Sequence, residues 1–156
     1  MDNQKLFFIT RDFAAMANNL FAEKKGKWGK MNAQQMIEHL AFVFKFSSKK
    51  IILPLQTPEE FLPKYKAFLL SDKEFRENTK APDIIIPEEP LAMRNLSYAE
   101  AINELETEIG DFVFYFKGDP ERKTLHPVFG ELNFEEWILL HYKHLVHHAK
   151  QFELMD

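Results

Sequence analysis

The chain of 156 residues contains no cysteine. Disulfide bonds, thiolate metal sites and cysteine nucleophiles are therefore excluded. The sequence also lacks any uninterrupted apolar run of the roughly 18 residues that a transmembrane helix needs. No Ser-His-Asp arrangement, phosphate-binding glycine loop or dinucleotide fingerprint is present. Any chemistry that the chain performs must come from other groups.

An excess of positive charge is missing as well. Lys and Arg number 20 against 24 for Asp and Glu, which gives a formal net charge of −4. This balance offers no electrostatic footprint for nucleic acid or for an anionic membrane, so we expect neither as a partner. The N-terminus lacks the basic start and the cleavage site of a signal peptide, so a cytoplasmic location is the expectation.

What is present is the composition of an ordinary folded domain. Hydrophobic residues make up 46% of the chain and charged residues 28%. The length is that of one domain with a real core, so we expect residues 1–156 to form a single domain. The 16 phenylalanines predict an aromatic-rich core or pocket lining.

Apolar residues recur at three- and four-residue steps in four long stretches, which is typical of helices that bury one face. The predicted helices cover residues 4–21, 33 to about 51, 97–116 and 133–152. Three of them begin with a polar cap followed by Gln or Glu at the third helical position, a capping box. The predicted pairs are Asn32 with Gln35, Ser97 with Glu100, and Asn133 with Glu136.

The connections between these helices are uneven in length. Thr57 and Pro58 resemble a helix start, and short helical pieces are expected from there to about residues 68–70. Residues 72–95 form a long irregular connection, which in a small domain often covers a site. Within it, Ile84–Ile86 either pack an extended segment onto the helices or form a short strand. Residues 125–130 are expected to be a turn-rich loop.

No alternating strand pattern is visible in the sequence. The predicted fold is therefore all-α. In detail, we expect a four-helix bundle with long irregular connections and a short extra helix.

Four of the six histidines fall within eight residues near the C-terminus. At about 100° per residue, His141, His144 and His148 lie within about 60° of one another. The same face carries Trp137, so it points inward. Three imidazoles on a core-facing stripe are hard to explain by packing alone. His39 sits on the inner face of the helix that begins at Ala33 and is a natural further ligand.

Neutral imidazole binds zinc, nickel, copper or iron(II), and His144 and His148 have the i, i+4 spacing that lets two side chains chelate one ion. With His39 they form a predicted set of three metal ligands. Three protein ligands leave coordination positions open for water or substrate, which is the pattern of a catalytic site. The expected cofactor is a divalent metal ion, zinc or nickel first, with manganese or iron as alternatives.

Other polar groups near this face allow more than one interpretation. His141 is a ligand, a proton shuttle or a pocket wall, and we select it as the acid–base residue. His147 points further round the helix, as a residue behind the ligands or at the surface. His126 is a loop histidine facing solvent or a residue at the pocket rim. Gln35 or Gln151 could orient a metal-bound water, or serve as a cap and a helix-end group.

The motif from His144 to Gln151, His-Leu-Val-His-His-Ala-Lys-Gln, resembles the C-terminal signature of the DinB-like (DinB/YfiT) superfamily. The segment from Trp28 to Leu40 is similar to the part of that superfamily that contains its first ligand, and His126-Pro-Val-Phe-Gly130 to one uncharacterised subgroup. The resemblance implies a metal-binding four-helix bundle, often dimeric. Carried over by position, it implies the same three ligands: His39, His144 and His148.

The resemblance also implies what the chain does. Some DinB-like proteins are thiol transferases and others are labelled metal-dependent hydrolases. We therefore expect an enzyme of one of these kinds that acts on a small-molecule substrate, in a homodimer. Two other interpretations stay open: a non-catalytic module in which a metal only joins helices, and a metal-free bundle whose histidines are core and whose function is dimerisation.

Overall fold

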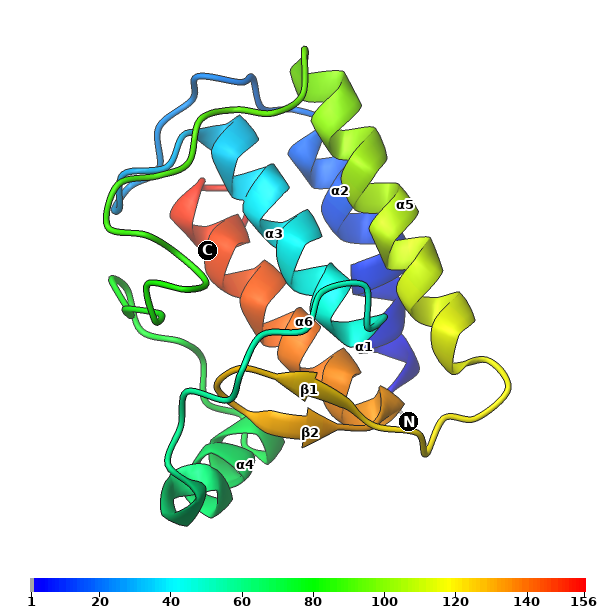
Figure 1. Cartoon of the computed structure of the whole chain (residues 1–156). Helices are drawn as coiled ribbons and strands as arrows, with labels where there is room; N and C mark the ends of the chain where they lie inside the picture. Colours follow the sequence, from blue (N-terminus) through cyan, green and yellow to red (C-terminus); the bar gives the residue numbers. More distant parts are fainter. Residues whose placement is uncertain (1) are drawn as a thin grey trace.

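The computed structural model describes residues 2–156. Its long secondary-structure elements are mostly helices (Figure 1). The chain begins with one helical stretch in three parts: α1 (Asn3–Phe7), a π-helical segment η1 (Phe8–Asp12) and α2 (Phe13–Ala17). Ile9, Phe13 and Ala17 are buried along it at four-residue steps. The predicted helix over 4–21 thus ends four residues early, where backbone bonds from Asn19 to Met16 and from Leu20 to Ala17 close a turn.

The three longest helices are α3 (Ala33–Ser47), α5 (Tyr98–Phe116) and α6 (Phe134–Gln151). The capping boxes predicted at Asn32 and Asn133 are confirmed. Ser97 caps α5, but the Glu100 carboxylate accepts from the Leu96 N–H instead of from the cap residue, so that box is only half formed. Helix α3 ends at Ser47 rather than near Ile51, and Lys49 takes a left-handed conformation with φ of 62°.

The short helical pieces expected before residue 70 are present as a 3₁₀ turn η2 (Glu59–Phe61) and helix α4 (Leu62–Leu70). Thr57 does not cap them. Its hydroxyl donates to the Val128 carbonyl at 2.6 Å instead. This bond ties the start of the α4 region to the loop that precedes α6.

The loop before α6 contains a β-hairpin. Strand β1 (Thr124–His126) pairs antiparallel with β2 (Gly130–Leu132), with Thr124 opposite Leu132 and His126 opposite Gly130. The prediction of an all-α four-helix bundle is therefore wrong, because the fold combines helices with a small antiparallel sheet. Strands of three residues are too short to display the alternation by which a sequence reveals them.

Residues 72–95 contain no helix or strand in the part of the chain that the structure describes, as predicted. Ile85 is buried in the core and Ile86 packs against it. The backbone here forms turns, with the Ile85 and Ile86 N–H groups both bonded to the Pro82 carbonyl. The expected packing onto the helices is therefore confirmed for Ile85 and Ile86, whereas Ile84 is exposed and the segment is a turn rather than extended.

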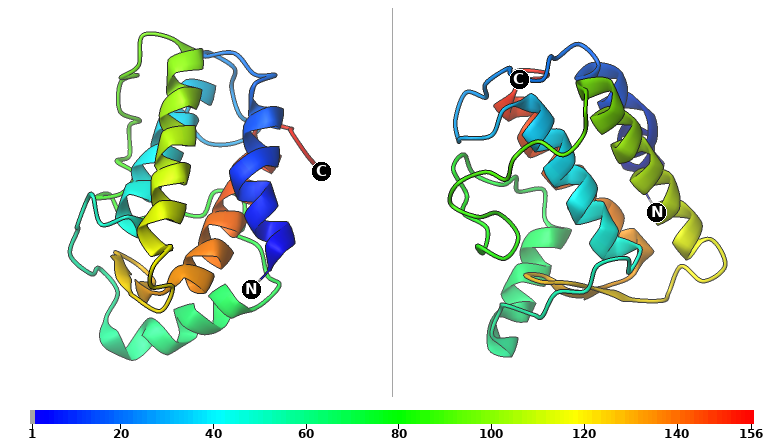
Figure 2. Two further views of the ribbon diagram at one scale, coloured as in Figure 1. Left: turned by 90° about the vertical axis from the view of Figure 1, so that its right-hand side faces the viewer. Right: turned by 45° about the horizontal axis from the view of Figure 1, so that its top comes forward.

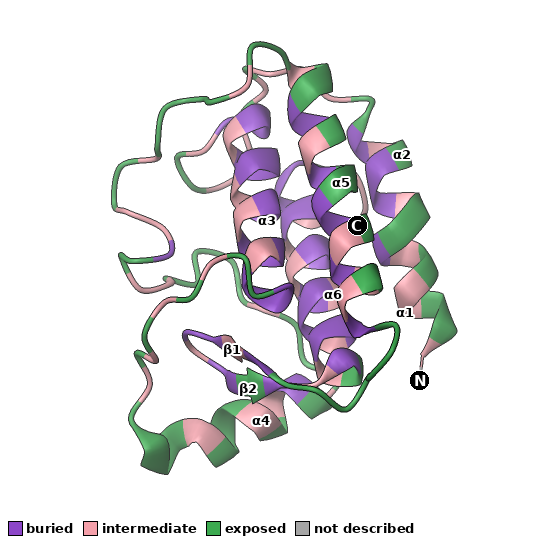
Figure 3. Cartoon of the chain, turned by 45° about the vertical axis from the view of Figure 1, so that its right-hand side comes forward, coloured by how far each residue is buried: buried purple, intermediate pink, exposed green. Residues whose placement is uncertain are grey.

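The helices run side by side, with α3 in contact with α5 and α6, and α2 in contact with the same two (Figures 1 and 2). Their buried faces point toward one another (Figure 3), and α4 and the hairpin lie at one end of them. Connection 72–95 passes along α3 (Figure 1). Within residues 2–156, no helix is both long and apolar enough to cross a membrane.

Candidate metal centre

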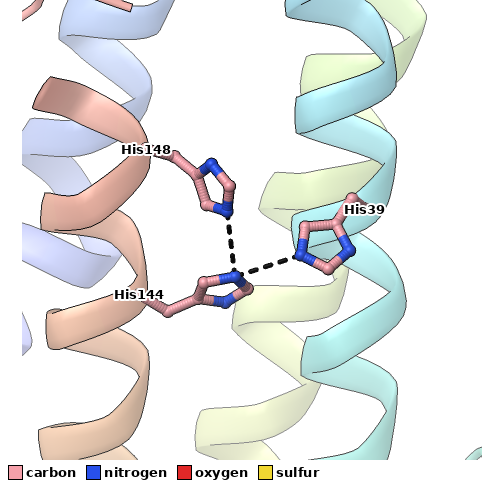
Figure 4. A group of neighbouring side chains, drawn as sticks. All are labelled: His39, His144 and His148. Atoms are coloured by element: carbon pink, nitrogen blue, oxygen red, sulfur yellow. Dashed lines mark hydrogen bonds between the residues drawn. The ribbon is translucent and has the colours of Figure 1, made fainter. Parts of the chain in front are cut away.

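The side chains of His39, His144 and His148 meet between two helices. His39 extends from α3, while His144 and His148 extend from successive turns of α6 (Figure 4). The Nε2 atom of His144 lies 3.1 Å from Nε2 of His39 and 3.0 Å from Nε2 of His148. One ligand atom from each of the three lies within 4.8 Å of the others. The structure thus brings together the residues that the sequence predicts as metal ligands, and they could hold a metal ion.

Hydrogen bonding among the three rings does not account for this arrangement. A neutral ring nitrogen carries either one N–H or one in-plane lone pair, so Nε2 of His144 cannot form good hydrogen bonds to both neighbours. A cation can accept the lone pairs of all three nitrogens. Three nitrogens bound tetrahedrally at about 2.1 Å from one ion would lie about 3.4 Å apart, close to the two short distances here. The donor set therefore fits a divalent metal ion.

Gln151 determines which nitrogen of His148 faces the cluster. Its amide nitrogen donates to the Trp28 carbonyl at 2.9 Å, which turns its oxygen toward His148, 2.6 Å from Nδ1. Because an amide oxygen only accepts, Nδ1 of His148 carries the proton and Nε2 presents its lone pair. Metal-bound histidines commonly have such a partner. Gln151 thus orients one of the three histidines directly.

The loop before α3 encloses the Gln151 side chain. A Cβ on Gly26 would lie 2.9 Å from Cγ of Gln151, and one on Gly29 would lie 2.8 Å from its Nε2. Gly29 also has a φ of 79°, a conformation that favours glycine. The Lys27 N–H donates to the Gln151 carbonyl at 2.7 Å. The two glycines therefore allow the loop to close on the residue that holds His148.

Burial keeps the three clustered histidines in their neutral form. It lowers the pKa of His39 to about 4, with a smaller contribution from His147. Burial and the neighbouring imidazoles lower the pKa of His144 and of His148 well below the usual range. Neutral imidazole is the form that binds a metal, so at neutral pH the ligands need not lose a proton first.

His141 lies apart from the cluster, inside the aromatic core. Its ring stacks on Phe44 with centroids 3.7 Å apart and on Trp137 with centroids 5.1 Å apart. Its Nε2 lies 3.0 Å from the Ser47 hydroxyl, which itself donates to the Phe44 carbonyl, so His141 is the donor. Its Nδ1 has no hydrogen-bond partner among residues 2–156. The acid–base role selected for His141 stays a prediction.

The two remaining histidines have other surroundings. His126 is buried in the hairpin, where its Nδ1 accepts from the N–H groups of Val128 and Phe129 at 2.9 and 3.2 Å. It is therefore buried rather than facing solvent, and its ring contacts are with Phe46, Phe129 and Trp137 rather than with the cluster. His147 is half-buried behind His148, with its ring centroid 5.5 Å from that of Trp28. This position agrees with the expectation that His147 lies behind the ligands.

Glu38 is the residue whose role the sequence did not reveal. Helical spacing suggests solvent or a seam between helices, yet its carboxylate is buried and accepts from the backbone N–H groups of Arg94 and Asn95 at 2.8–3.0 Å. These hydrogen bonds lower its pKa against the opposing effect of burial. Nothing near Glu38 in the sequence signals a partner 56 residues away. Glu38 thus anchors connection 72–95 onto α3.

Gln35 fastens the same connection. Its side-chain oxygen accepts from the Asn32 N–H at 2.9 Å as part of the cap, and its amide nitrogen donates to the Leu91 carbonyl at 2.9 Å. Beneath the connection lies a cavity of about 230 Å³, and the His39 ring forms part of its wall. The connection therefore covers a space that borders the histidine cluster.

Comparison with known proteins gives one result. The model of the family described as "Protein of unknown function (DUF1569)" matches residues 7–155, so the chain belongs to that family. Searches of the curated proteins and of the solved structures found no match.

Proposed function

We propose that this DUF1569 family member binds a divalent metal ion through the Nε2 atoms of His39, His144 and His148, and that it is an enzyme acting on a small molecule. The observation that supports this is the convergence of three Nε2 atoms that hydrogen bonds cannot satisfy together. Three neutral imidazoles favour zinc or nickel, whereas manganese more often takes carboxylate oxygens.

The reaction we propose is hydrolysis or thiol S-transfer. A bound divalent ion supplies Lewis acidity, which favours loss of a proton from water or from a thiol near neutral pH. The resemblance of residues 28–40 and 126–151 to DinB-like proteins supports the same two reaction types. It also supports a homodimer, which light scattering on the purified protein would test.

The residues around the cluster have positions that suit this role. Gln151 holds His148 with its lone pair toward the other two ligands. Glu38 is unsuited to act as a general base, since both of its oxygens already accept hydrogen bonds from Arg94 and Asn95. A substrate would reach the cluster past the His39 ring, which borders the cavity. Proton transfer is then left to the substrate, to solvent or to the histidines.

The deciding experiment is elemental analysis of gently purified protein in three forms: wild type, His148→Ala and His147→Ala. His147→Ala is the matched control, because it removes a neighbouring imidazole that is not in the cluster. We expect about one ion per chain in wild type and control and almost none in His148→Ala. Absence of metal from all three forms, even after incubation with zinc or nickel, would refute the proposal.

A metal-loaded protein would then be assayed with ester and thiol-conjugation substrates. Turnover that is lost in His148→Ala and kept in His147→Ala would support the enzyme. Stoichiometric metal with no turnover in either assay would favour the non-catalytic module, in which the ion only joins α3 to α6.

A further inference from the structure

The cavity beside His39 follows one stripe of α3. Gln35, His39, Phe42 and Lys45 all line it, and they recur at three- or four-residue steps on the helix. Residues 85–94 of the connection form the opposite wall. At 1.5 Å per residue, the stripe from Gln35 to Lys45 extends about 15 Å. The space is therefore elongated along α3, with His39 near its middle and Lys45 at one end.

Most of this lining is apolar. Met31, Phe42, Ile85, Ile86 and Pro87 are among the residues that line the cavity. Ligand pockets are commonly of this kind, with a few polar groups that fix the orientation of what they bind. A ligand of this cavity therefore needs an apolar body.

The polar groups at the cavity are almost all paired with one another. Glu38 accepts from the backbone of the connection. The Arg94 guanidinium forms two hydrogen bonds to the Glu104 carboxylate, each of 2.9 Å. These hydrogen bonds occupy the oxygens of Glu38 and Glu104 and both terminal nitrogens of Arg94, so the guanidinium is already engaged with a carboxylate of the protein.

Lys45 is held more loosely than these groups. Its ammonium forms an ion pair at 3.7 Å with the Glu104 oxygen to which Arg94 also donates, and its side chain forms no hydrogen bond among residues 2–156. Its side chain is 24% exposed, so it is held in place by its neighbours but remains accessible. An ammonium has three N–H donors to offer. At the end away from Gln35 the cavity thus has an ammonium that is ion-paired with Glu104 but whose N–H donors form no hydrogen bond among the described residues.

We propose that the cavity binds a small elongated molecule with an apolar body and a carboxylate, in which the Lys45 ammonium binds the carboxylate and the apolar body extends along Phe42 to His39. His39 and Lys45 are six residues apart, or about 9 Å along the helix. This assignment names the substrate class of the proposed enzyme and rests on that function for the reaction at the His39 end. The binding itself depends only on the cavity.

The test is calorimetric titration of the full chain with octanoate and with 1-octanol. The two probes share an apolar body, and only octanoate carries the acid. We expect octanoate to bind about tenfold more tightly than 1-octanol, because a charge-assisted hydrogen bond is added. In Lys45→Met this preference should disappear while 1-octanol binding is unchanged. Lys45→Arg should keep the preference, and Lys117→Met, at the far end of α5, should behave as wild type.

Equal affinity for the two probes, no binding of either, or a preference that survives Lys45→Met would each overturn the proposal. The titrations are run on chelator-treated protein and again with zinc. A preference for octanoate that requires zinc and is unchanged in Lys45→Met would mean that the carboxylate binds the ion. That result would also overturn the proposal. Octanoate binding through Lys45 without metal uptake would leave this inference standing and refute the proposed function. Metal uptake without octanoate binding would overturn this inference and leave the proposed metal site standing.

Discussion

Two groups of histidines have opposite surroundings, although their members on α6, His141 and His144, lie only a turn apart. In the cluster, the Nε2 atoms of His39, His144 and His148 point at one another. In the aromatic core, His141 donates to a serine and is stacked between rings, and His126 accepts two backbone N–H groups of its own hairpin. The same side chain thus serves as a candidate ligand in one place and as packing in the other.

The difference arises from the group that hydrogen-bonds to each ring. His141 and His148 share a stripe of α6, and both are almost fully buried. The amide oxygen of Gln151 accepts from Nδ1–H of His148, so Nε2 of His148 presents its lone pair to the cluster. His141 meets Ser47, and its other nitrogen has no hydrogen bond among the described residues. Whether a histidine of this stripe is a candidate ligand or part of the core therefore depends on the group that hydrogen-bonds to its ring. The position of the histidine on the stripe does not specify that group.

The largest effect that would test this contrast is expected at His141. Because its ring is 1% exposed and stacked on Phe44 and Trp137, His141→Ala should lower the free energy of unfolding by about 3 kcal/mol. The metal content of the folded protein should stay at the wild-type level. Urea unfolding and elemental analysis measure the two quantities.

His144→Ala is the matched variant, since it removes an imidazole one turn further along α6. It should abolish metal binding and cost the metal-free protein less than about 1 kcal/mol. The contrast between the two groups would fail if His141→Ala lost the metal and kept its stability. A His141 variant of unchanged stability and metal content but reduced turnover would support its predicted acid–base role.

The next effect concerns pH and the core histidine of the hairpin. Burial lowers the pKa of His126 from 6.5 to about 3, so the folded state keeps it neutral while the unfolded state protonates. The unfolded chain binds the extra proton, so stability is complete above pH 6.5 and is lost as pH falls toward 3. His126 alone should lower the free energy of unfolding by about 2 kcal/mol between pH 7 and pH 5.

Chelator-treated protein should be used for this measurement, with urea unfolding at both pH values. In His126→Gln the difference between pH 7 and pH 5 should shrink by about the same 2 kcal/mol, whatever the variant costs at pH 7. An unchanged difference would show that His126 is not a buried neutral acceptor.

The smallest effect should come from the support of His148. Gln151→Ala removes the acceptor for Nδ1 and should weaken zinc binding about tenfold. Gly29→Ala should weaken it by a smaller factor, because a Cβ there would press on the Gln151 amide. Competition with a fluorescent zinc chelator measures both affinities.

Gly118→Ala is the control for the glycine substitution, since a Cβ at Gly118 meets nothing within 4 Å. Its zinc affinity should equal that of wild type. If Gln151→Ala also bound zinc as wild type does, the orientation of His148 would have to come from packing alone.

The sequence predicts those features that local spacing specifies. The caps at Asn32 and Asn133 can be predicted because the residues that form them lie within three positions of one another. The i, i+4 spacing of His144 and His148 likewise places both side chains on one face of α6. The hairpin was missed, because its strands are three residues long and its turn depends on His126 accepting two backbone N–H groups. Neither the short strands nor the turn held by His126 produces a recognisable local sequence pattern.

Contacts between distant segments account for the other differences. The partners of Glu38, Arg94 and Asn95, lie 56 and 57 residues further along the chain. Gln151 bonds to Trp28 across 123 residues, and this contact gives it a role toward His148. The position of a side chain on its helix follows from the sequence, whereas the group that meets it there comes from the fold.

The separation of His39 and His144 along the chain links the metal to folding. These residues are 105 positions apart, so the chain must fold and close a loop of that length before both can hold one ion, and the unfolded chain has no such site. Binding to the folded state alone also raises stability with the logarithm of the free metal concentration. A cell short of the metal would then hold less of the folded protein, and its abundance would follow metal supply even with synthesis constant.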